Sequence, residues 1–365
     1  MATTIVHAAD VHLETVFADV RGGGARRAAL ADAFARIVDL ALERGADVLT
    51  IGGDLYESER AGPATARFLF AQFARFGKPV FVAPGNHDPF AARSIYARDD
   101  LPANVRVFAD ASWNAVPLAP DLTLYGFGHT PAEPGRPFAG ITFDRSGVRL
   151  ALVHGSDEER CPPGKRATAP FTAAEIRAAG ATLALTGHYH GGTVYADAAG
   201  PVFAYPGAPE PVKFGERGEH GALVVTVRDD ASIGVEAVPI ARTRLLEVTI
   251  PVGDAGDEAA VIAACERALD GLGKNDFVRA TLRGTVQPGT RVDRALLTER
   301  AGAHLGALDL VDRSTIADYA AIAHESNVRG RAVAELLAAA DGGDDDARRA
   351  LALVVAAFDG AEIAP

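Results

Sequence analysis

The sequence predicts an α/β protein, built as a layered sandwich in which helices cover two sheets and followed by a small second domain. Short β-branched runs alternate with helical stretches from residue 3 to about residue 190. Short strands broken by glycine and proline continue to about residue 240, which is typical of two sheets in one domain. A second strand–helix alternation follows, and a length of 365 residues is enough for two or three domains.

Six strands and two long helices are expected in the first region. The helix at 25–44 presents Leu30, Phe34 and Ile37 on one face, the spacing of an amphipathic helix that packs on a sheet. The helix at 63–76 follows the second strand and is rich in phenylalanine. The expected strands cover residues 4–7, 47–51, 79–82, 122–127, 149–153 and 181–185.

After residue 240 the pattern indicates a small βαβαβ domain and then two further helices. We therefore expect three domains, at residues 1–240, 241–320 and 321–365. The expected elements of the last two domains are strands at 245–252, 277–286 and 308–313, and helices at 257–272, 293–304, 325–340 and 344–358.

Composition and charge exclude several classes of protein. Hydrophobic residues make up 48% and charged residues 23% of the chain, which excludes disordered and collagen-like sequences. The apolar runs are too short to cross a bilayer and no secretory signal is recognisable, so a cytoplasmic location is expected. Cys161 and Cys265 fit no disulfide or zinc-finger pattern. With a net charge of −12, any contact with nucleic acid must rely on local arginines or bound cations.

Five of the expected strands are followed by side chains that bind divalent metal ions. These side chains are Asp10 and His12, then Asp54, then Asn86, then His154, and finally His188 and His190. Ligands bind outside the carboxyl ends of the strands in open α/β sheets, so we expect one shared pocket. Imidazole and carboxylate groups together suit manganese or zinc, and a single carboxylate can bridge two ions.

Spacing within the motifs supports this interpretation. One residue separates Asp10 from His12 and His188 from His190, so on an extended segment both side chains of each pair point the same way. Five of the ten histidines lie in these motifs, including His87. The remaining histidines are interpreted as structural residues of the core or the surface: His7, His129, His220, His304 and His324.

These motifs resemble the signature of the calcineurin-like metallophosphoesterase superfamily, which reads D-x-H, GD, GNH[DE], H and GHxH in this order. Within the superfamily, the chain is similar to the SbcD-type nucleases, which act with an SMC-type ATPase in DNA double-strand-break repair. The segments 205–210 (YPGAPE) and 214–217 (FGER) carry this closer likeness. Glu14 and Glu57 depart from the family pattern, at positions that the resemblance does not make metal ligands.

The resemblance implies a four-layer α/β/β/α metallophosphoesterase sandwich, a capping and DNA-binding second domain, and a C-terminal helix pair that docks on the ATPase. It also implies two divalent cations, which we expect to be Mn²⁺. The first would be bound by Asp10, His12, Asp54 and His190, and the second by Asp54, Asn86, His154 and His188. His87 is implied as the catalytic residue that faces the phosphate, oriented by Asp88.

Three weaker features concern partners, and each has a structural alternative. Arg21, Arg26 and Arg27 either contact DNA phosphates or belong to a solvated helix start. Phe68 and Phe70 lie off the apolar stripe of their helix, so they either pair two copies of the chain in a homodimer or pack in the core. The apolar faces of the C-terminal helices either dock on the ATPase or pack on each other or on the second domain.

The expected activity is that of a metal-dependent DNA nuclease, a 3′–5′ exonuclease on duplex ends and an endonuclease on single strands. Two alternatives stay open. The first is a phosphodiesterase that acts on small nucleotides or other phosphoesters, which the acidic net charge favours. The second is a non-catalytic scaffold that recruits an ATPase, which the complete set of ligand motifs opposes.

Overall fold

The computed structural model describes residues 2–17, 22–144, 146–161, 164, 166–216, 218–253, 255, 257–286, 293–316 and 318–358. The chain divides into two compact units, residues 1–244 and residues 245–365. Among the described residues, none of the helices combines the length and hydropathy that a membrane span needs.

Two six-stranded sheets form the centre of the first unit. The first sheet contains, in spatial order, β12 (Ile233–Pro239), β11 (Gly221–Val227), β1 (Thr3–Ala8), β2 (Val48–Ile51), β3 (Val80–Val82) and β4 (Val105–Val107). The second contains β5 (Asn114–Ala119), β6 (Leu122–Phe127), β7 (Val148–His154), β8 (Leu183–Gly187), β10 (Gly200–Tyr205) and β9 (Thr193–Asp197). The strands that lead to the predicted site are parallel, β1 to β3 in one sheet and β6 to β8 in the other.

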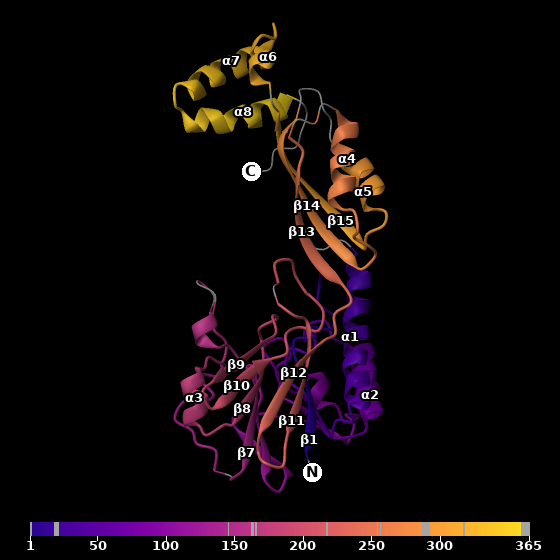
Figure 1. Ribbon diagram of the computed structural model, residues 1–365, viewed down its shortest axis with the longest axis vertical. Coiled ribbons are helices and arrows are strands. Elements are labelled where there is room, and N and C mark those ends of the chain that lie inside the picture. The colour runs from indigo at the N-terminus through magenta and orange to yellow at the C-terminus, as the bar shows by residue number, and fades with distance from the viewer. Residues whose placement is uncertain are drawn as a thin grey trace. The chain divides into compact units, whose positions relative to one another are not determined.

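Helices cover the outer faces of both sheets, which confirms the predicted α/β sandwich. The helices α1 (Gly23–Glu43) and α2 (Pro63–Phe76) lie side by side on the first sheet, whereas α3 (Ala173–Ala178) packs on the second (Figure 1). Leu30, Phe34 and Ile37 are buried, as the spacing of α1 predicts. Two single-turn 3-10 helices complete the unit, η1 (Ile95–Ala97) and η2 (Glu158–Arg160).

One hydrophobic core fills the space between the two sheets. Ile5 and Phe81 of the first sheet and Leu150 and Leu185 of the second belong to the same buried cluster. Strands that are buried on both faces need nearly continuous apolar sequences, which explains the short β-branched runs of the sequence. The polar side chains that follow these runs therefore lie beyond the core, at the carboxyl ends of the strands.

The phenylalanines of α2 pack mainly inside the first unit. Phe73 and Phe70 are buried, and the ring of Phe68 lies edge-on to that of Phe34, with 6.3 Å between the ring centroids. Of the two phenylalanines that lie off the apolar stripe, only Phe68 stays half-buried. Core packing, one of the two alternatives, therefore accounts for most of this apolar surface.

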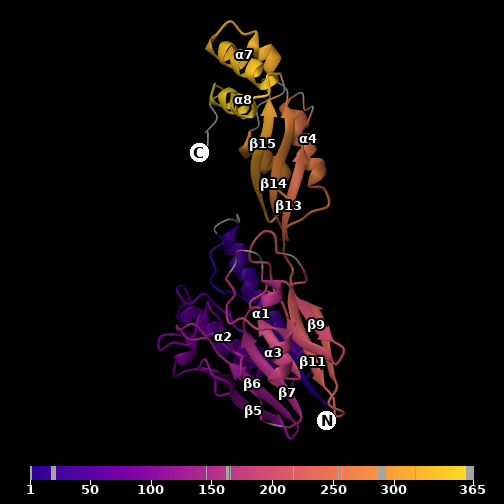
Figure 2. The same ribbon diagram turned by 90° about the vertical axis from the view of Figure 1, so that its left-hand side faces the viewer.

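The second unit begins with a three-stranded sheet of β13 (Arg244–Pro251), β14 (Asp276–Val286) and β15 (Ala307–Ile316), shown side by side in Figure 2. The helices α4 (Glu258–Ala268) and α5 (Arg294–Gly302) lie between these strands in the chain, in the βαβαβ order of the sequence pattern. β14 and β15 are parallel. The unit has a core of its own, in which Cys265 and Leu297 of the helices pack with Val278 and Leu308 of the sheet.

The chain then forms three helices, α6 (Tyr319–Ala323), α7 (Val328–Asp341) and α8 (Asp345–Phe358). Val333, Leu351 and Val355 are buried in one cluster, so the apolar faces of α7 and α8 pack on each other. Leu353 and Phe358 are large apolar side chains of α8 that stay 52% and 49% exposed.

Arg26 is a structural residue, so its predicted contact with DNA is wrong. Its side chain has no exposed surface and pairs with the equally buried Glu210 at 3.7 Å. It also donates hydrogen bonds to the Pro211 carbonyl and to the Thr243 hydroxyl. Burial of a guanidinium requires such partners, because an unpaired charge inside a protein is very costly.

The other two predicted DNA contacts have different outcomes. Arg27 is exposed on the first turn of α1, where its role stays a prediction. Arg21 lies outside the described residues.

Replacement of Glu210 by alanine is expected to destabilise the first unit strongly. Arg26 and Arg36 both bind this carboxylate, Arg36 at 2.8 Å, and breaking a buried ion pair costs about 3–5 kcal/mol. Urea denaturation followed by circular dichroism measures the effect. Asp39→Ala, which breaks an exposed ion pair with Arg75, is the matched control and should change the free energy of unfolding little. Equal effects of the two substitutions would contradict the expectation.

Candidate metal centre

The structure brings the seven predicted ligands together at one edge of the sandwich. Asp10 and His12 follow β1, Asp54 follows β2, Asn86 follows β3, His154 ends β7, and His188 and His190 follow β8. Among the described residues, the ligand atoms of Asp10, His12 and His190 lie within 4.8 Å of one another, and those of Asp54, His154 and His188 form a second such group. These groupings agree with the two sets of ligands that the resemblance implies, whereas the binding of ions itself stays a prediction.

Asp54 lies between the two groups. Its Oδ2 atom is 3.7 Å from His12 Nε2 and 3.3 Å from His154 Nε2. Its Oδ1 atom accepts a hydrogen bond of 2.8 Å from the His87 backbone N–H, which holds the carboxylate in this orientation. The side chain is almost fully buried, so Asp54 is placed to share its charge between two cations.

The first group has a geometry that fits a cation. His12 donates its Nδ1 proton to Glu57 at 2.8 Å, and His190 donates its Nδ1 proton to Glu216 at 2.6 Å. In the neutral rings both Nε2 atoms then carry lone pairs, and these atoms face each other at 3.1 Å. Two facing lone pairs repel unless a proton or a cation lies between them, so the donor set fits a metal ion.

The second group repeats this geometry. His154 donates its Nδ1 proton to the Gly52 carbonyl at 2.8 Å, which leaves the Nε2 lone pair for the site. This Nε2 atom lies 3.3 Å from His188 Nδ1 and 3.1 Å from Asn86 Oδ1. Nitrogen and oxygen donors of this kind suit manganese, iron or zinc.

Burial and neighbouring charges shift the pKa values of the predicted ligands. Burial lowers the pKa of His154, but the neighbouring Asp54 and Asp10 carboxylates outweigh burial and raise this pKa to about 9. Burial raises the pKa of Asp10, which lies in the same cluster. Bound cations would replace the imidazole protons as the partners of the two carboxylates, so metal binding releases protons and weakens as the pH falls.

The backbone at the ligands differs from the extended geometry that the spacing predicted. Asp10, His12, Asp54 and His188 have φ angles of 56°, 51°, 51° and 114°. Non-glycine residues rarely adopt this left-handed region, at a cost of about 1–3 kcal/mol each, and such residues cluster at functional sites. The two side chains of the Asp10–His12 pair therefore reach one group through a tight, strained turn rather than along an extended strand.

His87 is held by Glu57, and the prediction that Asp88 orients it is wrong. The His87 side chain is 45% exposed, and its Nδ1 atom donates to Glu57 Oε2 at 2.8 Å. The other oxygen of the same carboxylate accepts from His12 Nδ1 at 2.8 Å. The hydrogen bond to Glu57 raises the pKa of His87 to about 9. One carboxylate therefore orients both a predicted ligand and the predicted catalytic histidine.

Asp88 is buried and joins two loops of the site. Its carboxylate accepts hydrogen bonds from the backbone N–H groups of Asp54, Leu55 and Gly85 and from the Tyr96 hydroxyl. These contacts tie the loop after β2 to the loop after β3. Asp88 therefore supports the position of Asp54, and its part in the site is structural.

The sequence does not predict Glu57 and Glu216 as site residues, although both lie at positions that bear on the resemblance. Glu57 is a departure from the family pattern, and Glu216 lies in the FGER segment. Glu216 accepts from His190 Nδ1 and, through its second oxygen, from the Val212 backbone N–H at 2.8 Å. Carboxylates that accept from the distal nitrogen of a metal-binding histidine fix the tautomer and orientation of its ring.

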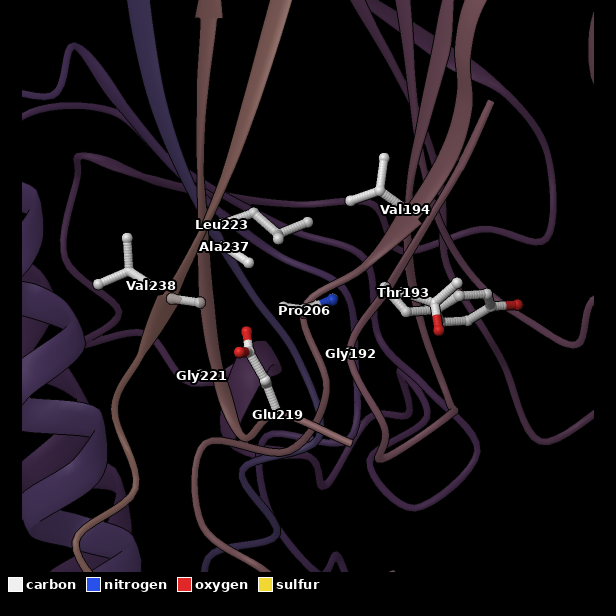
Figure 3. Close-up of a pocket in the computed structure, with 11 residues that line it drawn as sticks. Gly192, Thr193, Val194, Pro206, Glu219, Gly221, Leu223, Ala237 and Val238 are labelled. Atoms are coloured by element: carbon white, nitrogen blue, oxygen red, sulfur yellow. The ribbon is translucent and has the colours of Figure 1, made fainter. Parts of the chain in front are cut away.

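A cavity of about 100 Å³ lies elsewhere in the first unit. It opens between the edge strands of the two sheets, where Val194 and Leu223 point toward each other (Figure 3). Glu219 also lines it, but none of the predicted metal ligands is among its lining residues. The candidate metal centre is thus separate from this mainly apolar space.

Comparison with known proteins places these features in context. The sequence pattern of the calcineurin-like phosphoesterases matches residues 3–192. No curated protein matches the chain. A dimetal phosphatase from Danio rerio is 13% identical with a TM-score of 0.40, over 62% of this chain and 93% of that chain. An archaeal phosphodiesterase is 9% identical with a TM-score of 0.36, over 65% and 100%. A protein from Thermus thermophilus is 12% identical with a TM-score of 0.41, over 65% and 99%.

Proposed function

Because the chain belongs to the calcineurin-like phosphoesterase family, whose members hydrolyse phosphoesters with divalent metal ions, we propose that it is a DNA nuclease of the SbcD type. It would hydrolyse phosphodiesters at a dinuclear centre, as a 3′–5′ exonuclease on duplex ends and an endonuclease on single strands. We further propose manganese as the metal and DNA double-strand-break repair as the process.

One observation carries this proposal. Glu216 belongs to the FGER segment, on which the likeness to the SbcD-type nucleases rests, and it holds the predicted ligand His190 at 2.6 Å. The same loop carries Glu210, whose carboxylate accepts from the backbone N–H groups of Arg242 and Thr243 at the end of the first unit. The segment that carries the likeness to these nucleases therefore contacts a predicted metal ligand, which supports the proposal.

In the proposed mechanism, Asp54 and the two ligand groups would hold two divalent ions. Two bound divalent ions supply Lewis-acid stabilisation of the phosphate charge and activation of water. The Nδ1–H group of His87 donates a hydrogen bond to Glu57. The Nε2–H group is therefore the one that would face the phosphate and give a proton to the departing oxygen. Because Glu57 raises the pKa of His87 to about 9, this proton is present at neutral pH.

A phosphodiesterase for small nucleotides is the second candidate, because the net charge of −12 disfavours a polyanion such as DNA. Incubation of the purified chain with a 3′-labelled duplex and with bis-p-nitrophenyl phosphate, with and without manganese, separates the two. Manganese-dependent shortening of the duplex is the result that the nuclease proposal expects. Hydrolysis of the small ester alone would favour the second candidate, and hydrolysis of neither would favour the scaffold.

We also propose that the C-terminal helices bind a coiled-coil ATPase. The exposed Leu353 is expected to contribute to this contact, because Leu351 and Val355 are already buried between α7 and α8. Leu353→Asp should abolish capture of the ATPase from the same organism in a pull-down assay. Leu42→Asp, at an exposed leucine of α1, should leave capture unchanged. Unchanged capture by the Leu353 variant would contradict the proposal.

A further inference from the structure

His7 is a buried imidazole that connects the two sheets. It lies in β1 and has no exposed surface. Its Nδ1 atom is 3.0 Å from Thr50 Oγ1, on β2 of the same sheet. Its Nε2 atom is 3.0 Å from the Thr186 carbonyl oxygen, on β8 of the other sheet. The ring therefore makes one bond within a sheet and one bond between the sheets.

The partners of His7 determine its tautomer. The Thr186 carbonyl can only accept, so Nε2 carries the proton and donates it. Nδ1 then carries a lone pair and accepts a hydrogen bond from the Thr50 hydroxyl at 3.0 Å. The same hydroxyl is farther, 3.4 Å, from the Val6 carbonyl oxygen, so it donates to His7 in preference. Burial lowers the pKa of His7 to about 4, so the ring is neutral and both nitrogens are satisfied.

This ring lies beside a close backbone contact between the two sheets. A Cβ atom on Gly187 would lie 2.1 Å from the Gly52 carbonyl oxygen, and one on Gly52 would lie 3.0 Å from His7 Cε1. The absence of side chains at these two positions lets the backbones of β8 and the β2 end touch. The imidazole fills the space beside this contact.

The spacing of the sheets matters because each predicted ion takes ligands from both. Asp10 and His12 of the first sheet share a group with His190 of the second, and Asp54 shares a group with His154 and His188. A change in sheet spacing would therefore alter both groups at once.

Other hydrogen bonds also cross between the sheets near His7. The Asp10 carboxylate accepts from the His188 backbone N–H at 2.9 and 3.1 Å, and His154 Nδ1 donates to the Gly52 carbonyl. Both are made by predicted ligands, so neither can be removed without damage to the ligand set. His7 is not a ligand, which makes its crossing bond separable from metal coordination.

We propose that His7 is a positioning residue of the dinuclear centre, whose Nε2–H bond to the Thr186 carbonyl sets the spacing of the sheets and thereby the separation of the two ions. The inference rests on the proposed function, because it requires two bound ions.

The test compares His7→Leu with Thr50→Val in the full chain. His7→Leu keeps the volume and burial of the side chain but loses both hydrogen bonds. Thr50→Val removes only the bond within the first sheet and is the matched control. Both proteins are titrated with manganese(II) in a calorimeter, and the loaded proteins are studied by low-temperature electron paramagnetic resonance. In this spectrum two manganese ions that lie close together give a spin-coupled signal, and isolated ions do not.

For His7→Leu we expect the second manganese ion to bind about 10- to 100-fold more weakly and the spin-coupled signal to give way to that of isolated ions. Thr50→Val should keep the wild-type signal and stoichiometry. If His7→Leu does not fold, His7→Asn replaces it, since asparagine keeps an acceptor near Thr50 but is too short to reach Thr186.

The outcomes separate this inference from the proposed function. A spin-coupled signal that survives in His7→Leu, or one that is lost equally in Thr50→Val, overturns the role of His7 and leaves the proposed function intact. Wild-type protein that binds no manganese overturns the dinuclear centre, and the positioning role with it.

Discussion

Asp54→Asn is expected to remove the metal ions and with them almost all hydrolysis. Asparagine keeps the size of the side chain and an acceptor for the His87 N–H, but it loses the charge that lies between His12 and His154. Metal ions contribute several kcal/mol to the transition state, and each 1.4 kcal/mol is a factor of ten, so the loss should be about 10⁴-fold or more in kcat/KM. Metal analysis by plasma mass spectrometry and an ester hydrolysis assay measure both effects.

Asp39→Ala serves as the control for Asp54→Asn. It also removes one carboxylate, but from the exposed surface of α1, where Asp39 pairs with Arg75. We expect unchanged metal content and activity. If Asp54→Asn retained two ions per chain and full activity, the role predicted for Asp54 between the two ligand groups would be wrong.

His87→Gln is expected to retain both ions and lose most turnover. The His87 side chain is half-exposed and its contact is with Glu57, so its removal leaves the ligand groups in place. A positioned general acid contributes about 10²–10⁴-fold, and we expect a fall of this size in kcat. Metal content and kcat are measured on the same preparation. Loss of metal equal to that in Asp54→Asn would contradict a catalytic role for His87.

The pH dependence gives a second measure of the same group. The hydrogen bond to Glu57 raises the pKa of His87 to about 9, so the proton is present below this pH and activity should fall as the pH rises through it. In Glu57→Gln the neutral amide cannot stabilise the imidazolium, so the pKa should return toward the ordinary value of about 6.5 and the fall should begin at lower pH. An unchanged profile in Glu57→Gln would show that another group limits activity.

Much of the fold follows from local patterns. The apolar face of α1, the strand at 122–127 and the helix at 63–76 were predicted from periodicity, and the structure has them. The spacing of apolar residues reflects which face of an element packs on its neighbour, so this spacing predicts the element correctly. Short edge strands such as β4 and β5 were missed, because three to six residues of mixed polarity give no periodic signal.

The residues of the candidate site also fall into two groups, those that the sequence predicts and those that only the folded structure identifies. The ligand side chains could be named from the sequence, because each follows a strand end and the carboxyl ends of the strands converge. Glu57 and Arg26 could not be placed, since a glutamate or arginine in a loop carries no local sign of its partner. Only the folded chain brings Glu57 between His12 and His87, and Arg26 onto Glu210.

The sandwich, the donor set and the order of the motifs follow from the sequence, because they depend on residue type and on spacing along the chain. The tertiary structure alone decided which oxygens orient the histidines, the left-handed turns at Asp10 and His12, and the bond from His7 to the second sheet. The physical reason is distance along the chain. His7 and Thr186 are 179 residues apart, and only the packing of two sheets on one core brings such groups within hydrogen-bonding reach.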